Sequence, residues 1–214
     1  MKRLLISSSL QSALLEYSPS SLGPLWLSSI TAVPTEPGFF IVNSACPDID
    51  DSIHKPHGGK NFVVFVDPTK KRPIYILQNT VDPSLTARDF IDQRLLDAFT
   101  YRESMGYNRR YQSAYRLVNG RRDCLPGLSI DVYTQEHAVI SLSSTFWFHY
   151  IDDVLIRFCN KSLPSLKSIA IVNNSSNETT SYSSDIIFGD ASISTVNVLE
   201  ARKYNHFDHK NHFV

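Results

Sequence analysis

A stretch with helical periodicity, residues 86–105, separates two groups of short apolar runs in this 214-residue chain. Thr86 stands three residues before Asp89, a spacing typical of the capping box that begins a helix. The apolar residues that recur on one face of this helix are Ile91, Leu95, Ala98 and Phe99. The pattern predicts one half-buried helix with strands before and after it, which is an α+β fold.

The segment before the helix predicts a small barrel of short strands. Its expected strands cover residues 39–42, 62–66 and 74–77. Asp67 and Pro68 favour a hairpin turn between the last two. Residues 45–60 are rich in Asp, Pro and Gly, so we expect an exposed loop there. Residues 3–6 suit a first strand, which we favour, although the basic and serine-rich N-terminus also suits a short transit peptide.

The segment after the helix predicts more strands and a second helix. Its expected strands cover residues 115–118, 128–133, 138–142, 168–172, 186–188 and 192–199. Residues 134–136 are expected at the tip of a hairpin between the second and third of these strands. Apolar residues recur at helical spacing from Trp147 to Phe158 and predict an amphipathic helix. Strands, a helix and strands again indicate a small α/β domain.

Two turn signals fall close together in residues 114–133. Asn119-Gly120 predicts a tight turn, because both residue types tolerate positive φ. Pro126-Gly127 predicts another, because Pro presets φ at the first corner and Gly supplies positive φ at the second. Arg121 lies between them, and turns that lift arginines off a strand pair suit a surface that meets phosphates. A solvated hairpin with spare arginines is the alternative.

Arginines interleaved with tyrosines surround these turns, and we call them the basic strip. The strip contains Arg102, Arg109, Arg110, Arg116, Arg121 and Arg122, with Tyr101, Tyr107, Tyr111 and Tyr115, and its one acid is Glu103. Arg binds phosphates and stacks on bases, and Tyr stacks on unpaired bases, so the strip predicts RNA contact. The residues expected to make that contact are Arg109, Arg110, Arg116, Arg121, Arg122 and Tyr115. Alternatively, the tyrosines pack the helix–strand junction and the arginines are solvated.

Composition narrows the classes of protein. The formal net charge of zero argues against a generally cationic nucleic-acid binder, so local charge must decide any such binding. No stretch approaches the ~20 apolar residues of a membrane span, so no membrane partner is expected. The cysteines form no metal or disulfide pattern, and reduced thiols suit a cytoplasmic protein, with a mitochondrion or plastid as the alternative. His206, His209 and His212 recur every three residues near the C-terminal end. Chance explains this spacing better than a metal site does, so no metal site is predicted.

Residues 114–133 resemble a motif of RlmI-type S-adenosylmethionine-dependent methyltransferases of large-subunit ribosomal RNA. The motif runs Arg-Leu-hydrophobic-x-Gly and, a few residues later, Leu-Pro-Gly-Leu-x-hydrophobic-Asp-x-Tyr. The positions in step with it are Arg116, Leu117, Gly120, Asp123, Leu125, Pro126, Gly127, Leu128, Asp131 and Tyr133. Arg121 departs from the motif, because the family usually carries an acidic residue after the glycine.

The resemblance extends to both sides of this motif. Residues 87–106 are similar to a family helix, and residues 22–42 resemble the start of its PUA-like barrel. Residues 198–213 resemble a family motif in part, and the matching positions are Glu200, Lys203, Phe207 and Asp208. The resemblance implies a PUA-like β-barrel in residues 1–82, a central α/β domain in residues 83–200, and the start of a truncated methyltransferase domain in residues 201–214.

By resemblance, the chain is the N-terminal, RNA-binding portion of a cytosine-5 methyltransferase that uses S-adenosylmethionine and a cysteine in its C-terminal domain. No glycine-rich turn follows a strand, so we expect this chain alone to bind no cofactor. The partial motif match in residues 198–213 is the one source of cofactor-binding candidates, which are Lys203, Phe207 and Asp208. No catalytic residue is expected. Cys124 is the one thiol in an electropositive setting, but no base or cofactor stands near it in the pattern.

The expected partners are RNA, ribosomal by resemblance, and either a second copy of the chain or a separate catalytic half. Two alternatives stay open. One is a non-catalytic RNA-binding protein, either a decayed relative or a truncated product. The other is a protein-interaction module that holds its partner through exposed aromatic side chains.

Overall fold

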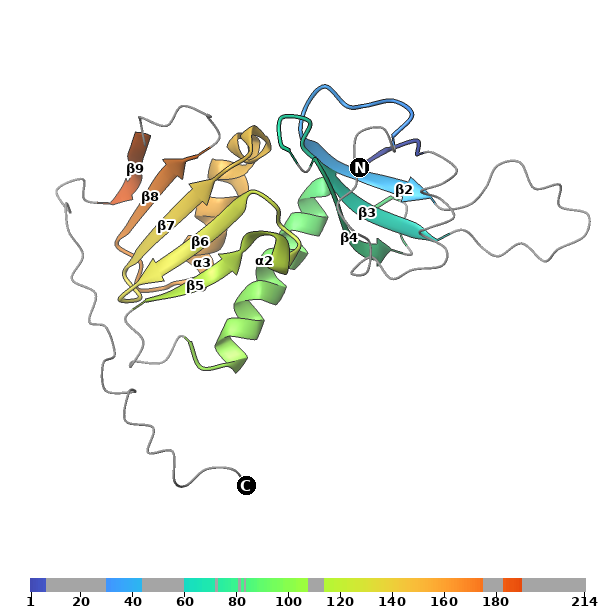
Figure 1. Ribbon diagram of the computed structural model, residues 1–214. Helices are drawn as coiled ribbons and strands as arrows, with labels where there is room; N and C mark the ends of the chain where they lie inside the picture. The colour runs from blue at the N-terminus through green and yellow to red at the C-terminus, as the bar shows by residue number, and fades with distance from the viewer. Residues whose placement is uncertain are drawn as a thin grey trace, which may run out of the picture.

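The computed structural model describes residues 1–6, 30–43, 60–71, 73–80, 82, 84–107, 114–174 and 183–189, and the strands among them form two sheets (Figure 1). The first sheet has the order β1 (Lys2–Arg3), β2 (Gly38–Asn43), β3 (Asn61–Val66), β4 (Ile74–Thr80). The second has the order β5 (Ala114–Asn119), β6 (Leu128–Tyr133), β7 (His137–Leu142), β8 (Ser168–Asn173), β9 (Ser183–Gly189). Helix α2 (Ala87–Ser104) joins the sheets along the chain.

The α+β prediction is confirmed, but the described strands form no closed barrel. Within the first sheet they pair only in the order β1 to β4, whereas a barrel needs its first and last strands to pair as well. Strand β1 runs parallel to β2, and β2, β3 and β4 are antiparallel. Of the strand expected over residues 3–6, only Arg3 lies in β1, and Leu4 and Ile6 are buried just after it. The PUA-like assignment and the domain boundary at residue 82 stay predictions.

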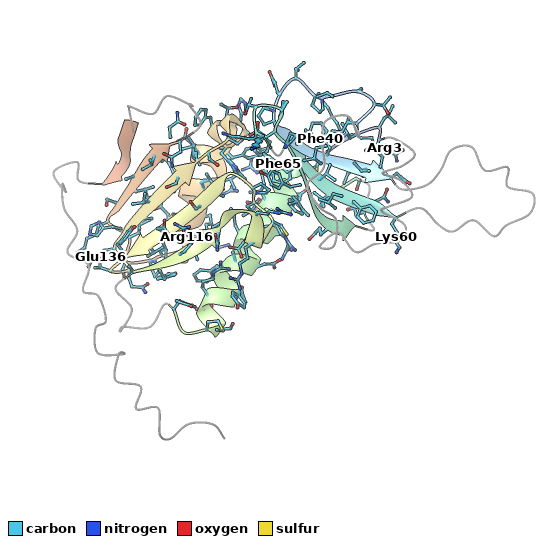
Figure 2. The ribbon with its side chains drawn as sticks, in the orientation of Figure 1. Arg3, Phe40, Lys60, Phe65, Arg116 and Glu136 are labelled. Carbon is cyan, nitrogen blue, oxygen red and sulfur yellow. The ribbon has the colours of Figure 1, made fainter. Side chains whose placement is uncertain are left out.

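Strand β3 is buried on both faces because its side chains alternate between two apolar clusters. Phe62 and Val64 pack with Leu4 and Ile6 in a small cluster on one face. Val63 and Phe65 belong to the larger core, which also contains residues of α2 and of the second sheet. Figure 2 shows Phe65 in the region between the two sheets. One continuous core therefore fixes the first sheet against the rest of the described chain.

Helix α2 begins as the sequence predicts. The backbone N–H of Asp89 donates to the Thr86 hydroxyl oxygen at 3.1 Å, and that hydroxyl donates to the Asp89 carboxylate at 2.6 Å. These bonds satisfy one of the free N–H groups at the helix start. The apolar side chains that the helix buries are Phe90, Ile91, Leu95 and Ala98. Among the described residues, no helix is long and apolar enough to cross a membrane.

The connection from β7 to β8 differs from the single amphipathic helix expected between Trp147 and Phe158. It consists of a 3-10 helix η4 (Thr145–Tyr150), a π-helical segment η5 (Ile151–Ile156) and the short α3 (Arg157–Ser162). Strands β7 and β8 are parallel and need such a crossover. Trp147 is fully buried, and its indole N–H donates to the Pro126 carbonyl at 2.8 Å. This hydrogen bond fixes the start of the connection. It joins segments that are distant in the sequence, so the helical spacing of apolar residues could not predict it.

Candidate nucleic-acid interface

The turn after β5 presents two arginines to solvent. A short 3-10 helix, η3 (Gly120–Asp123), occupies this turn, and Arg121 and Arg122 are exposed on it. The chain turns at Asn119-Gly120 as expected, and Gly120 has a φ of +46°, but Asn119 has a φ of −117° and does not use the positive φ that it tolerates. A hydrogen bond from Leu125 N to Gly120 O, 2.9 Å long, closes the turn.

The second predicted turn, at Pro126-Gly127, is confirmed. Leu128 N donates to Leu125 O at 3.1 Å, and Gly127 has a φ of +82°. A Cβ added to Gly127 would lie 3.0 Å from Ser144 Cβ and 3.2 Å from Trp147 Nε1. Glycine is therefore required here both for its backbone conformation and for the close packing of the turn against Ser144 and Trp147.

Arg102, at the end of α2, has an internal partner. Its Nη1 and Nη2 donate to Asp123 Oδ1 and Oδ2 at 2.8 and 2.6 Å, and its side chain is 10% exposed. The backbone N–H of Asn119 also donates to Asp123, at 2.6 Å. Asp123 thus neutralises Arg102 and holds η3 against α2, which takes this arginine out of the cationic part of the basic strip.

Two residues of the predicted RNA contact are also engaged by the protein. Arg116 donates through Nε and Nη2 to the Asp131 carboxylate at 2.7 and 2.9 Å, and this pairing raises the pKa of Arg116. Figure 2 shows Arg116 on the second sheet, and its side chain is 51% exposed. Tyr115 is only 8% exposed, and its ring centre lies 6.0 Å from that of Tyr107. The Tyr115 ring therefore packs within the helix–strand junction, which leaves no open face for a base.

Arg121 and Arg122 remain as exposed cations of the strip. The Arg121 guanidinium carbon lies 5.3 Å from the centre of the Tyr75 ring, which belongs to β4 of the first sheet. Neither arginine has a carboxylate partner among the residues that the structure describes. The predicted contacts Arg109 and Arg110, and the predicted cofactor residues Lys203, Phe207 and Asp208, lie outside the described residues and stay predictions.

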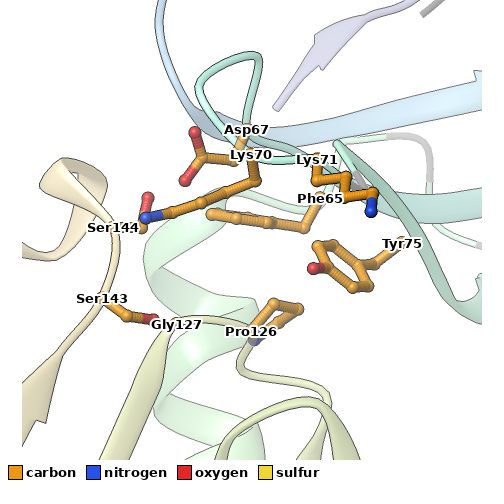
Figure 3. A pocket seen from close by; sticks show the side chains of 9 residues that line it. All are labelled: Phe65, Asp67, Lys70, Lys71, Tyr75, Pro126, Gly127, Ser143 and Ser144. Atoms are coloured by element: carbon orange, nitrogen blue, oxygen red, sulfur yellow. The ribbon is translucent and has the colours of Figure 1, made fainter. Parts of the chain in front are cut away.

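A cavity of about 310 Å³ lies between the two sheets, beside Tyr75. Figure 3 shows the residues around it, which come from β3, the β3–β4 turn, β4, the Pro126-Gly127 turn and the segment that follows β7. The lining residues that can bind or recognise a ligand are Asp67, Lys70, Lys71, Tyr75 and Ser144. The predicted hairpin turn at Asp67 is confirmed, because Lys70 N donates to Asp67 O at 3.1 Å.

Tyr75 joins this cavity to the arginine turn, because it lines the cavity and also contacts Arg121. We call Lys70, Lys71, Arg121 and Arg122 the basic rim. Lys70 is half-buried and Lys71 is exposed, and neither forms an ion pair within the described part of the chain. Our reading of the sequence missed the two lysines. The run Lys70-Lys71-Arg72 was a signal for them in the sequence. Only the folded chain brings Lys70 and Lys71 to the cavity that is also lined by Tyr75, the residue that Arg121 contacts.

The described thiols are not activated as nucleophiles. Burial is the main cause that raises the pKa of Cys124, and Arg94 lowers it only in part. The electropositive influence predicted from the neighbouring Arg121 and Arg122 is thus outweighed by loss of water. Burial also raises the pKa of Cys159 to about 12. Both thiols therefore stay protonated at neutral pH, and Cys46 lies outside the described residues.

The described residues do not fit S-adenosylmethionine in the way that a doubly wound fold binds it. Such a site needs parallel strands with a glycine-rich turn after the first of them. In the second sheet the one described parallel pair is β7–β8, and β7 is followed by Ser143 and Ser144 rather than glycines. The bulky Phe146 and Trp147 then fill the start of η4 and are buried.

Solved structures share this fold. A protein from Streptococcus mutans assigned as a SAM-dependent methyltransferase aligns with 89% of this chain at a TM-score of 0.60 and 13% identity, over 44% of its own length. A second, assigned as a methyltransferase and complexed with SAH, aligns with 89% of this chain at a TM-score of 0.55 and 14% identity, over 43% of its own length. No protein-family model matches the sequence, and no curated protein matches it significantly. This chain spans less than half the length of either structure, and its fold is the one that part of each of these proteins adopts.

Proposed function

We propose that this chain is the RNA-contacting portion of an RlmI-like, S-adenosylmethionine-dependent methyltransferase that modifies cytosine C5 in ribosomal RNA. The likeness to parts of two proteins assigned as methyltransferases supports the methyltransferase relationship. The motif in residues 114–133 supports the RlmI-like relationship. In this proposal the cofactor and the catalytic cysteine belong to a methyltransferase domain outside the residues described here.

The basic rim is the observation that carries RNA contact. Lys70 and Lys71 line the cavity with the half-buried Tyr75, and Arg121 contacts the Tyr75 ring and is followed in the chain by Arg122. None of these four cations pairs with a described carboxylate. Cations that bind phosphates beside a ring on which a base can stack are what a single-stranded RNA site requires. The chain's net charge of zero does not oppose this, since local potential governs such binding.

The salt dependence of RNA binding tests this proposal. Fluorescence anisotropy with a labelled single-stranded RNA of mixed sequence would give the slope of log K against log salt concentration. Each lost phosphate contact should reduce the magnitude of that slope by about 0.7 for single strands. The Arg121→Ala/Arg122→Ala variant should therefore lose up to about 1.4, and adding Lys70→Ala and Lys71→Ala should lose up to about 2.8.

The matched control is Arg157→Ala/Lys161→Ala, which removes the same number of charges from α3, and neither residue belongs to the rim or lines the cavity. If both double variants change the slope equally, or if neither changes it, the rim does not bind RNA. An unchanged slope together with capture of a protein partner would favour the interaction-module alternative. Calorimetry should detect no binding of S-adenosylmethionine to this chain, and clear micromolar binding would overturn the placement of the cofactor site elsewhere.

A further inference from the structure

Two residues that line the cavity between the sheets each have a buried side-chain oxygen without a hydrogen-bond partner among the described residues. Asp67 is 1% exposed and Ser144 is 2% exposed, and both residues line the cavity. Asp67 Oδ1 accepts hydrogen bonds from Thr69 N and Thr69 Oγ1, at 3.1 and 2.6 Å. Within the described residues, Asp67 Oδ2 and Ser144 Oγ have no hydrogen-bond partner.

A buried carboxylate oxygen without a donor lowers the stability of the fold, because burial removes its hydrogen bonds to water and no hydrogen bond within the protein replaces them. A ligand that donates an N–H to Asp67 Oδ2 would recover that loss. A carboxylate only accepts hydrogen bonds, whereas a hydroxyl can donate or accept. The cavity therefore favours a ligand that presents a hydrogen-bond donor to Asp67 beside a polar atom for Ser144.

The charges around the cavity restrict the ligand further. Lys70 and Lys71 line the same space as Asp67. A simple anion would meet the buried carboxylate, and a simple cation would meet two lysines, so neither suits the whole cavity. A nucleotide suits it, because its base can donate an amino N–H while its phosphate lies by the lysines. The volume of about 310 Å³ is at the small end for ligand sites, which fits one nucleoside and not a duplex.

We propose that this cavity receives one unpaired RNA base that carries an exocyclic amino group, and that Asp67 Oδ2 accepts a hydrogen bond from that group. Ser144 Oγ binds the neighbouring polar atom of the base edge, and Lys70 and Lys71 bind its phosphate. Tyr75 supplies the aromatic wall, and its contact with Arg121 continues the site toward the rest of the basic rim. This inference rests on the proposed RNA contact and adds a preference among bases.

Cytosine and uracil provide a sharp comparison, since they differ mainly at the edge that would meet Asp67. Cytosine presents an amino group where uracil presents a carbonyl oxygen, which would repel the carboxylate. Carboxylates accept from the cytosine amino group in known base recognition. One hydrogen bond to a charged group is enough to favour oligo(C) over oligo(U) by about tenfold or more.

The experiment measures binding of labelled oligo(C) and oligo(U) of equal length by anisotropy. The wild-type protein should bind oligo(C) at least about tenfold more tightly. Asp67→Asn keeps an oxygen for the bonds from Thr69 but places an amide donor at the position of Oδ2. It should abolish or reverse the preference while the salt slope stays unchanged. Ser144→Ala should reduce the preference, and it serves as a second test if Asp67→Asn fails to fold.

The matched control is Asp82→Asn. Asp82 caps its turn in the same way, accepting from Ser84 N and Ser84 Oγ at 2.8 and 2.6 Å, but it does not line the cavity. This control should keep the full preference for oligo(C). Equal binding of both oligomers by the wild-type protein would overturn the base site and leave RNA contact intact. Failure to bind either oligomer at low salt would overturn the proposed function itself, and the base site with it.

Discussion

The Arg121 guanidinium lies 5.3 Å from the centre of the Tyr75 ring, and this contact links the turn after β5 to strand β4 of the other sheet. Cation–π contacts of this kind hold a guanidinium at a defined place while leaving its N–H groups free for another ligand. The contact places Arg121 beside Tyr75, which lines one cavity together with Lys70 and Lys71. The relative position of the two sheets therefore determines whether the rim exists.

The buried pair of Arg102 and Asp123 should be essential for stability. Arg102→Ala leaves the Asp123 carboxylate buried without its main partner, and we expect a loss of about 3–5 kcal/mol in the free energy of unfolding. Urea denaturation would measure it. Arg157 is the control, because its pair with Asp92 is 3.9 Å long and both side chains are exposed, so Arg157→Ala should cost less than about 1 kcal/mol. Equal losses in the two variants would contradict a structural role for the buried pair.

Gly127 should tolerate a side chain less well than Gly120. Both have positive φ, but an added Cβ at Gly127 would lie 3.0 Å from Ser144 Cβ, whereas at Gly120 the nearest atom is Leu128 O at 3.4 Å. We expect Gly127→Ala to cost about 2–4 kcal/mol and Gly120→Ala about 1–2 kcal/mol. Thermal unfolding of the two variants checks the order, and the reverse order would refute the packing argument.

Asp131 should restrain Arg116, because their bidentate pair occupies the guanidinium. Asp131→Asn removes the charge and leaves Arg116 free to meet a phosphate. The variant should bind single-stranded RNA more tightly, and its salt slope should become steeper by up to about 0.7. Arg116→Ala should change both quantities little. If Arg116→Ala weakens RNA binding as much as Arg121→Ala does, the pair opens when RNA binds.

Burial of Cys159 should make stability depend on alkaline pH. Burial raises the pKa of Cys159 to about 12 in the folded protein, from an ordinary value of 9.0. Between these values the unfolded thiol loses its proton while the folded one keeps it. The free energy of unfolding therefore falls as pH rises, with a slope from this group of up to about 1.4 kcal/mol per pH unit. Urea denaturation between pH 8 and 11 should show a shallower fall for Cys159→Ala than for the wild-type protein, and identical slopes would contradict this.

The sequence by itself determined the local elements. The spacing of Thr86 and Asp89 predicted the start of α2, and the apolar runs predicted β2, β3, β4, β5, β6, β7 and β8 to within three residues at each end. The Pro126-Gly127 turn was also predictable. In all these cases the cause is local, either a cap, a fixed φ or the alternation of side chains along one segment.

Only the tertiary structure decided which side chains are available to a ligand. Arg102 and Arg116 look like free cations in the sequence, but Asp123 and Asp131 neutralise them. Tyr115 alternates with arginines, but the core covers it. Asp67 and Ser144 are 77 positions apart in the printed sequence, and they line one cavity only because β3 and the end of β7 meet in the fold. Ion pairing, burial and shared cavities depend on contacts between distant segments, and no local pattern encodes them.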